Sequence, residues 1–178
     1  NHIFISHLHG DHYLGLIGLI QTMHLLGRTS ELTIYCPSNI QEIVEVNLRI
    51  SESHLKYPIV YKSVNPKKSE LVYENDKLEV ISIPLKHRIA CSGYLFKEKP
   101  KPRRINPKAI NAHDIPKYQI NKIKLGEDYT SKNGELINNM RLTLDGLPSF
   151  SYTFCSDTKY FESIIPIIKD VDLLYHEA

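Results

Sequence analysis

Three histidines and an aspartate lie within six residues near the start of the chain, in the sequence His-Leu-His-Gly-Asp-His. His7 and His9 are two residues apart, and in extended backbone such residues point to the same side, so they can share one metal ion. After Gly10 the chain is expected to bend into a helix, which directs Asp11 and His12 towards a second ion beside the first. Imidazole and carboxylate ligands suit Zn²⁺, and Mn²⁺ or Fe would also fit. The cluster therefore predicts a metal site rather than a group of packed histidines.

Three further candidates follow strand-like segments, where functional residues collect in α/β folds: His87, Asp157 and His176. Taken alone, His87 would also suit a surface position, and Asp157 would suit a helix N-cap. Two metal ions need more ligands than one turn offers, so the cluster favours the ligand interpretation for both residues. His176 is either a ligand or a general acid for a leaving group. The remaining histidines are interpreted as structural or solvated, namely His2, His24, His54 and His113.

The elements that must position these residues alternate along the chain. A buried strand over 2–6 precedes the cluster, and apolar residues close to helical spacing predict a helix over 11–26. Further strands are expected at 32–36, about 58–64, 70–74, 78–84, 91–96, 149–155 and 172–176, and helices at about 37–53 and 159–169. Pro166 should kink or shorten the last helix. Interleaved strands and helices indicate a layered α/β architecture.

The stretch 97–146 departs from this pattern, with four prolines, scattered apolar residues and few strand signals. Residues 97–124 hold nine lysines and arginines against two acidic residues, a net charge of +7, whereas the whole chain carries +2. The rest of the chain is therefore at −5. Charge segregated in this way predicts either an excursion from the core that contacts a polyanion or a solvated mobile loop.

Composition places the chain among ordinary globular proteins. Its 178 residues suffice for one domain, and 22 basic against 20 acidic residues exclude a polybasic whole-chain binder. The longest run of apolar residues and glycine has seven residues, Leu14–Ile20, so no membrane span is expected, and no signal peptide is visible. Three widely spaced cysteines are expected to be reduced and buried, as in a cytoplasmic protein. Because both ends lie within strand-like segments, we expect a piece of a longer protein.

The motifs resemble those of a known family. Residues 7–12 match the H-x-H-x-D-H turn that marks the metallo-β-lactamase superfamily. Residues 9–20 resemble the first motif of ribonuclease Z, the tRNA 3′-processing endonuclease, and 84–94 resemble its later histidine motif. Residues 156–158 and 172–178 match its last two motifs, in order. The similarity extends over essentially the whole chain.

The resemblance implies a fold and a set of roles. The fold would be a metallo-β-lactamase-like αββα sandwich of two mixed sheets with outer helices, incomplete at both ends of this chain. His7, His9 and His87 would bind the first of two zinc ions, Asp11 and His12 would bind the second, and Asp157 would bridge them. Asp11 would also accept a proton from the attacking water, and His176 would assist the scissile phosphate or its leaving oxygen. The family's last zinc-binding histidine lies outside this chain.

The function that the resemblance implies is removal of the 3′ trailer from precursor tRNA by a cytoplasmic homodimer. Cleavage would leave a 3′-hydroxyl on the tRNA and a 5′-phosphate on the trailer. Residues 97–146 fall where the family inserts a tRNA-binding arm, although Lys117–Lys122 replace its usual Gly-Pro-rich tip. The arm residues expected to bind tRNA are Lys101, Arg103, Arg104, Lys108, Lys117, Lys122 and Lys124.

Two alternatives stay open. The same metal ligands could serve a small-molecule phosphodiesterase, an arylsulfatase or a lactamase. The basic segment argues against these enzymes, because a small substrate gains nothing from it. The second alternative is that the chain is an inactive fragment that binds metal and RNA without catalysing a reaction.

Overall fold

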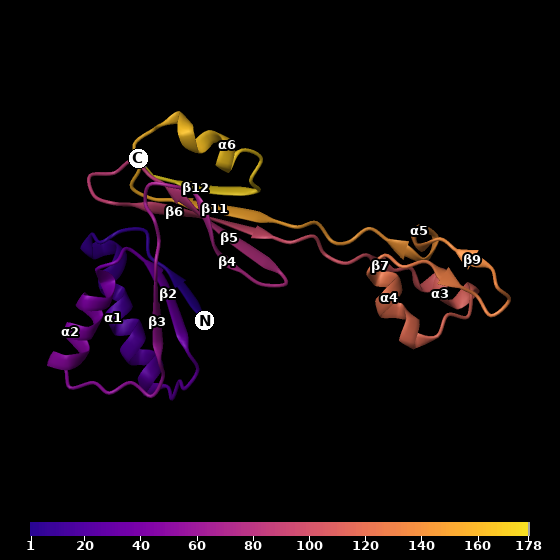
Figure 1. The fold of residues 1–178 in the computed structure, drawn as a ribbon, viewed down its shortest axis with the longest axis horizontal. Coiled ribbons are helices and arrows are strands. Elements are labelled where there is room, and N and C mark those ends of the chain that lie inside the picture. Colours follow the sequence, from indigo (N-terminus) through magenta and orange to yellow (C-terminus); the bar gives the residue numbers. More distant parts are fainter. Residues whose placement is uncertain (178) are drawn as a thin grey trace. The chain divides into compact units, whose positions relative to one another are not determined.

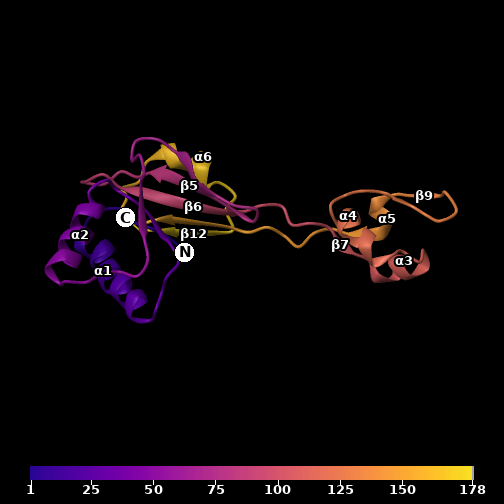
Figure 2. The same ribbon diagram turned by 60° about the horizontal axis from the view of Figure 1, so that its bottom comes forward.

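The computed structural model describes residues 1–177, which form two compact units (Figures 1 and 2). The first unit combines Asn1–Lys97 with Phe150–Ala178, and the second comprises Glu98–Ser149. The candidate metal ligands all belong to the first unit.

The first unit contains a three-stranded parallel sheet in the order β1-β2-β3, covered by two helices (Figure 1). All five residues of β2 are buried, as expected for a central parallel strand that is covered on both faces. Ile20 of the first helix, Ile34 of β2 and Val44 of the second helix belong to one apolar cluster and are fully buried. The elements are β1 (His2–Phe4), α1 (Gly10–Leu25), β2 (Leu32–Cys36), α2 (Ile40–Ile50) and β3 (Ile59–Ser63).

A second sheet of five strands has the order β12-β11-β6-β5-β4. It is mixed, because β11 pairs in parallel with β12 and antiparallel with β6. Ile83 of β5, Cys155 of β11 and Ile164 form an apolar cluster under the short helical segment that follows β11. The elements are β4 (Glu70–Glu74), β5 (Leu78–Pro84), β6 (Ser92–Glu98), β11 (Ser151–Cys155), η2 (Glu162–Ile164), α6 (Ile165–Ile168) and β12 (Leu173–His176).

A third apolar cluster joins the two sheets face to face. Tyr35 of β2 packs with Val80 of β5 and Tyr94 of β6, and all three are buried. The Tyr94 hydroxyl donates a 2.8 Å hydrogen bond to the carbonyl oxygen of Ile5, just after β1. The layers therefore run helix, sheet, sheet, helix, which confirms the predicted α/β sandwich.

Most element predictions hold, and the helix expected over 159–169, with a kink or shortening at Pro166, is present in shorter form. It covers only 162–168, as the adjoining segments η2 and α6, because Phe161 before it is extended with a φ of −159°. Pro166 lies in the first turn of α6, where its missing N–H costs no hydrogen bond. The three cysteines are buried and free, as predicted. Within residues 1–177, no helix is both long and apolar enough to cross a membrane.

The second unit has its own apolar core, which the scattered sequence pattern did not predict. Ile123, Ile137 and Leu142 are almost fully buried in it, although every element is short. Asparagine side chains cap two of the helices, Asn106 at Lys108 N and Asn138 at Met140 N. The elements are β7 (Arg104–Ile105), α3 (Pro107–Ala112), η1 (Lys117–Gln119), α4 (Ile120–Lys124), β8 (Tyr129–Thr130), β9 (Leu136–Ile137), α5 (Asn139–Leu142) and β10 (Thr143–Leu144).

Candidate metal centre

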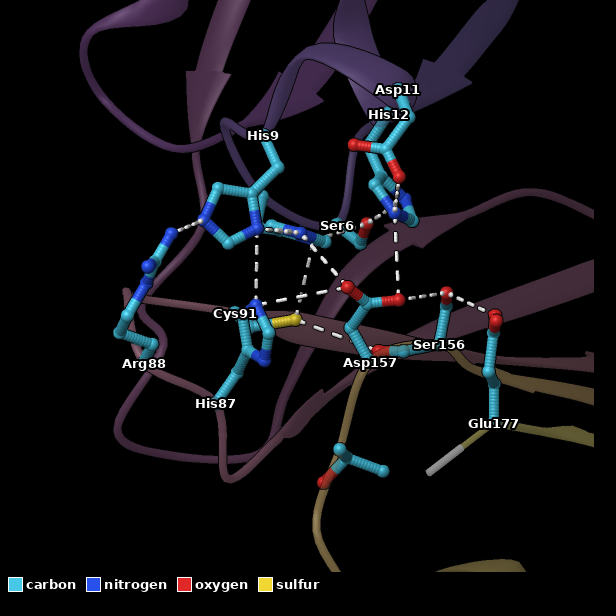
Figure 3. A network of polar contacts seen from close by, with 12 residues as sticks. Ser6, His9, Asp11, His12, His87, Arg88, Cys91, Ser156, Asp157 and Glu177 are labelled. Atoms are coloured by element: carbon cyan, nitrogen blue, oxygen red, sulfur yellow. Dashed lines mark hydrogen bonds and ion pairs between the residues drawn. The ribbon is translucent and has the colours of Figure 1, made fainter.

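Four of the predicted ligands converge at the ends of three strands (Figure 3). His7 and His9 lie between β1 and α1, His87 follows β5, and Asp157 follows β11. His9 Nδ1 lies 3.0 Å from His7 Nε2 and 3.1 Å from His87 Nε2. Asp157 Oδ2 lies 3.6 Å from His7 Nε2 and 3.7 Å from His87 Nε2. Three imidazole nitrogens and one carboxylate oxygen therefore face a common centre.

The spacing and the chemistry of these four atoms fit a metal ion. Ligand atoms at 2.0–2.1 Å from a tetrahedral zinc ion stand about 3.3 Å from one another, and the four measured separations lie between 3.0 and 3.7 Å. His7 is fully buried, and this desolvation, with the neighbouring histidines, lowers the pKa of His7 to about 4. A neutral imidazole offers the lone pair that a metal requires.

A second group of ligands lies on the other side of Asp157. His12 Nε2 lies 3.3 Å from Asp11 Oδ2 and 3.5 Å from Asp157 Oδ1. The two carboxylate oxygens of Asp157 thus face different groups, Oδ2 towards His7 and His87 and Oδ1 towards His12 (Figure 3). Three residues make up this second group, one ligand short of a closed tetrahedral zinc site. The structure therefore brings all six predicted metal ligands together around one carboxylate.

Asp157 reaches this position through an unusual backbone. Its φ of 55° lies in the left-handed region, where aspartate is tolerated better than most residues. Partial burial raises the pKa of its carboxyl group, but the hydrogen bond that Ser156 Oγ donates to Oδ1 at 3.0 Å and the three nearby histidines outweigh it. The pKa of Asp157 is consequently below its ordinary value, and the group is a carboxylate at neutral pH.

Several supporting residues were not predicted from the sequence. Ser6 Oγ lies 3.1 Å from His7 Nδ1 and 3.5 Å from His12 Nδ1, so one hydroxyl contacts a ligand from each group. Cys91 Sγ lies 3.6 Å from His7 Nδ1. These contacts hold the ring nitrogens that face away from Asp157, which directs the Nε2 atoms inwards.

The last strand places Glu177, and not His176, against the site residues. Glu177 Oε2 lies 3.2 Å from Ser156 Oγ and accepts a hydrogen bond from Tyr175 Oη at 3.0 Å. His176 is exposed on β12, and within residues 1–177 its side chain has no polar contact with the metal ligands. Successive residues of a strand point to opposite faces, which separates the two neighbours. A catalytic role for His176 stays a prediction.

The seven residues of the second unit that were expected to bind tRNA fall into two sets. Lys101 pairs with Glu98 at 2.7 Å, Arg103 pairs with Asp145 at 2.8 Å, and Arg104 donates to the Asp145 carbonyl oxygen. The others are exposed or half-exposed, and within residues 1–177 no carboxylate pairs with them: Lys108, Lys117, Lys122 and Lys124. The unit as a whole has ten basic and six acidic residues, a net charge of +4.

Curated proteins named ribonuclease Z align with this chain over its whole length. Ribonuclease Z of Bacteroides fragilis is 44% identical over 178 residues, which are 100% of this chain and 59% of the relative. Ribonuclease Z of Parabacteroides distasonis is 48% identical over the same length and share. The resemblance to ribonuclease Z is confirmed. No family model matches the chain.

A solved structure supports the fold. The crystal structure of human tRNase Z, short form, superposes with a TM-score of 0.58 at 20% identity, covering 99% of this chain and 57% of that one. The predicted metallo-β-lactamase-like sandwich is thereby confirmed. This chain spans somewhat under three fifths of the length of the ribonuclease Z relatives that it matches.

Proposed function

We propose that this chain carries the metal centre of a ribonuclease Z-like endoribonuclease, which removes the 3′ trailer from precursor tRNA. The observation that carries the proposal is the Asp157 carboxylate, whose two oxygens face two separate ligand groups. Paired cations that share a carboxylate are suited to phosphodiester hydrolysis, because they can stabilise both the attacking and the leaving oxygen. The similarity to ribonuclease Z over the full chain supports this substrate class.

Each ligand has a proposed role. His7, His9 and His87 would hold one Zn²⁺, Asp11 and His12 would hold a second, and Asp157 would bridge them; Mn²⁺ or another divalent ion could replace zinc. Zinc, when bound, supplies the Lewis acidity that brings the pKa of water near 7. Asp11 is suited to orient the attacking water and to accept its proton, because its carboxylate is exposed at 78%. The products would be a tRNA 3′-hydroxyl and a trailer 5′-phosphate.

The second unit is the proposed tRNA-binding arm. Its net charge of +4 and its exposed lysines would contact the phosphate backbone, which supplies affinity without reading base sequence. By the same family resemblance we propose a cytoplasmic homodimer as the working form. Lys108, Lys117 and Lys122 are the arm residues best suited to this contact, because Arg103 and Arg104 already bind within the unit.

The function is tested with precursor tRNA and a chromogenic phosphodiester, on the full-length protein. Asp157→Ala should abolish cleavage of both substrates and lower the metal content measured by elemental analysis. Asp76→Ala is a matched control, because Asp76 is exposed in the turn between β4 and β5. Diester hydrolysis by the wild type without cleavage of precursor tRNA would reject the nuclease and favour a small-molecule phosphodiesterase. Precursor tRNA binding without hydrolysis of either substrate would indicate an RNA-binding protein.

The arm is tested separately. Replacing Lys108, Lys117 and Lys122 by glutamine should weaken tRNA binding and leave hydrolysis of the small diester unchanged. The matched control replaces Lys56, Lys67 and Lys77, three exposed lysines of the first unit. Parallel loss of both activities in the arm variant would refute a separate binding role for the second unit.

A further inference from the structure

Arg88 stands beside the metal ligands without an acidic partner. It is exposed in the loop between β5 and β6, and its Nη2 atom lies 3.0 Å from His9 Nε2. Within residues 1–177, no carboxylate lies at ion-pair distance from it. An arginine that contacts only a histidine next to a candidate active site calls for an explanation.

With a metal ion on His9, this contact would become a pair of donors. Its Nδ1 atom faces His7, His87 and the proposed metal position, so a metal at Nδ1 leaves the ring proton on Nε2. A metal-bound histidine normally donates this second N–H to a carboxylate, a carbonyl oxygen or water. Here the neighbour is a guanidinium group, which has no acceptor atom. The two groups are complementary only if an oxygen that can accept hydrogen bonds lies between or beside them.

We propose that the Arg88 guanidinium and the Nε2–H of His9 together bind a phosphate oxygen of the RNA backbone. The inference rests on the proposed function and adds a substrate-binding residue to it. Arginine is well matched to phosphate, because its planar fork can donate two parallel hydrogen bonds. Two donors about 3 Å apart can converge on one oxygen at ordinary hydrogen-bond distances.

The position of Arg88 identifies which phosphate it would hold. In Figure 3, Arg88 lies on the side of His9 that is turned away from Asp157. The reacting phosphate must lie near Asp157, between the two ligand groups, so Arg88 would bind a neighbouring phosphate. A small pocket is lined by Leu8, Pro37, Ser38, Asn39, Ile89 and Ala90. Leu8 adjoins His9 and Ile89 adjoins Arg88 in sequence, so this pocket could receive part of the adjacent nucleotide.

Substrates with one and with several phosphates distinguish this role from a structural one. In the zinc-loaded full-length protein, Arg88→Met should weaken binding of a short fluorescein-labelled single-stranded RNA about 10- to 100-fold by fluorescence anisotropy. Hydrolysis of bis(p-nitrophenyl) phosphate, which has a single phosphate, should stay within about twofold of the wild type, because that contact is absent. Zinc content should be unchanged. Arg88→Lys should recover part of the RNA affinity, since it keeps the charge and loses the fork.

Arg49→Met is the matched control, because Arg49 is exposed at the end of α2, and RNA affinity should not change. An equal effect of Arg88→Met and Arg49→Met on RNA affinity would overturn the proposal. So would a parallel loss of diester hydrolysis, or a loss of zinc from Arg88→Met. Failure of the wild type to cleave precursor tRNA would reject the proposed function. The comparison of RNA affinity between Arg88→Met and Arg49→Met would still decide whether Arg88 contacts a phosphate.

Discussion

Replacing Gly93 by alanine tests whether the pairing of β6 with β11 holds Asp157 in place. An added Cβ at Gly93 would stand 2.6 Å from the carbonyl oxygen of Phe154 and 3.2 Å from Cys155 Sγ. Non-bonded heavy atoms prefer separations of about 3.5 Å, so the strands would have to move apart locally by roughly 0.9 Å. The crowded atoms belong to β11, which ends two residues before Asp157.

The expected effect has two parts. Overpacking of this kind typically costs about 1–3 kcal/mol, which should appear as a lower free energy of unfolding. Metal–ligand distances tolerate deviations of only about 0.2 Å, so a strand shift of roughly 0.9 Å should also disturb the position of Asp157. We expect zinc affinity to fall about 10- to 100-fold, as for other changes in the support of a metal ligand.

Gly18→Ala provides the control with the same chemical change. Gly18 is exposed in the interior of α1, and an added Cβ would meet nothing within 4 Å. Alanine is favoured over glycine in a helix by about 0.8–1.0 kcal/mol, so this variant should be slightly more stable and should bind zinc normally. Urea unfolding and zinc competition with a chromophoric chelator measure both quantities. Unchanged stability and affinity of Gly93→Ala would refute the proposed coupling.

Three further changes probe other contacts. Ser6→Ala removes the hydroxyl that contacts both ligand groups and should lower zinc affinity about 10- to 100-fold, measured by the same competition assay. Unchanged affinity would show that Ser6 does not support the two histidines. Tyr94→Phe leaves the buried Ile5 carbonyl oxygen without its 2.8 Å donor and should lower the free energy of unfolding in urea by about 1–3 kcal/mol. An unchanged free energy of unfolding would show that this hydrogen bond does not stabilise the sandwich. Ile123→Ala should destabilise the core of the second unit by about 2–5 kcal/mol, measured as faster limited proteolysis of that unit. Zinc binding should not change. A concurrent loss of zinc would contradict the view that the two units are independently stable.

The candidate metal ligands could be predicted from sequence because most of their pattern is local. His7, His9, Asp11 and His12 lie in one turn, and their spacing alone indicates two groups. Asp157 and His87 required a further rule, that functional residues collect at strand ends. The structure brings both to the cluster.

The supporting residues could not be predicted, because their contacts arise from tertiary packing. Ser6, Cys91 and Glu177 resemble ordinary strand residues until β1, β6 and β12 are brought together. The only sequence feature that pointed to Glu177 is its position next to His176 in the motif at 172–178. Residue type alone favours His176 as the functional residue, whereas the contact of Glu177 with Ser156 becomes visible only in the structure.

The short elements of the second unit escaped prediction for a different reason. Periodicity needs several turns or alternations to be visible, and α4 and α5 have only five and four residues. These short segments are held together instead by the hydrogen bonds of individual side chains. Asn139 donates to the carbonyl oxygens of Ile123 and Glu127 and accepts from Thr143, so one buried amide joins several short segments.

Charge is divided between the units in a way that bears on how RNA would be bound. The whole chain carries +2 and the second unit carries +4, which leaves −2 on the unit with the metal ligands. A polyanion gains little from a surface of that sign, since electrostatic affinity for RNA depends on cations that neutralise phosphates. On the proposed function, attraction of RNA to the first unit would therefore be local, from metal ions held by the candidate ligands and from single residues such as Arg88. On the proposed function, the second unit would set affinity and its salt dependence, and the metal centre would set the position of the reacting phosphate.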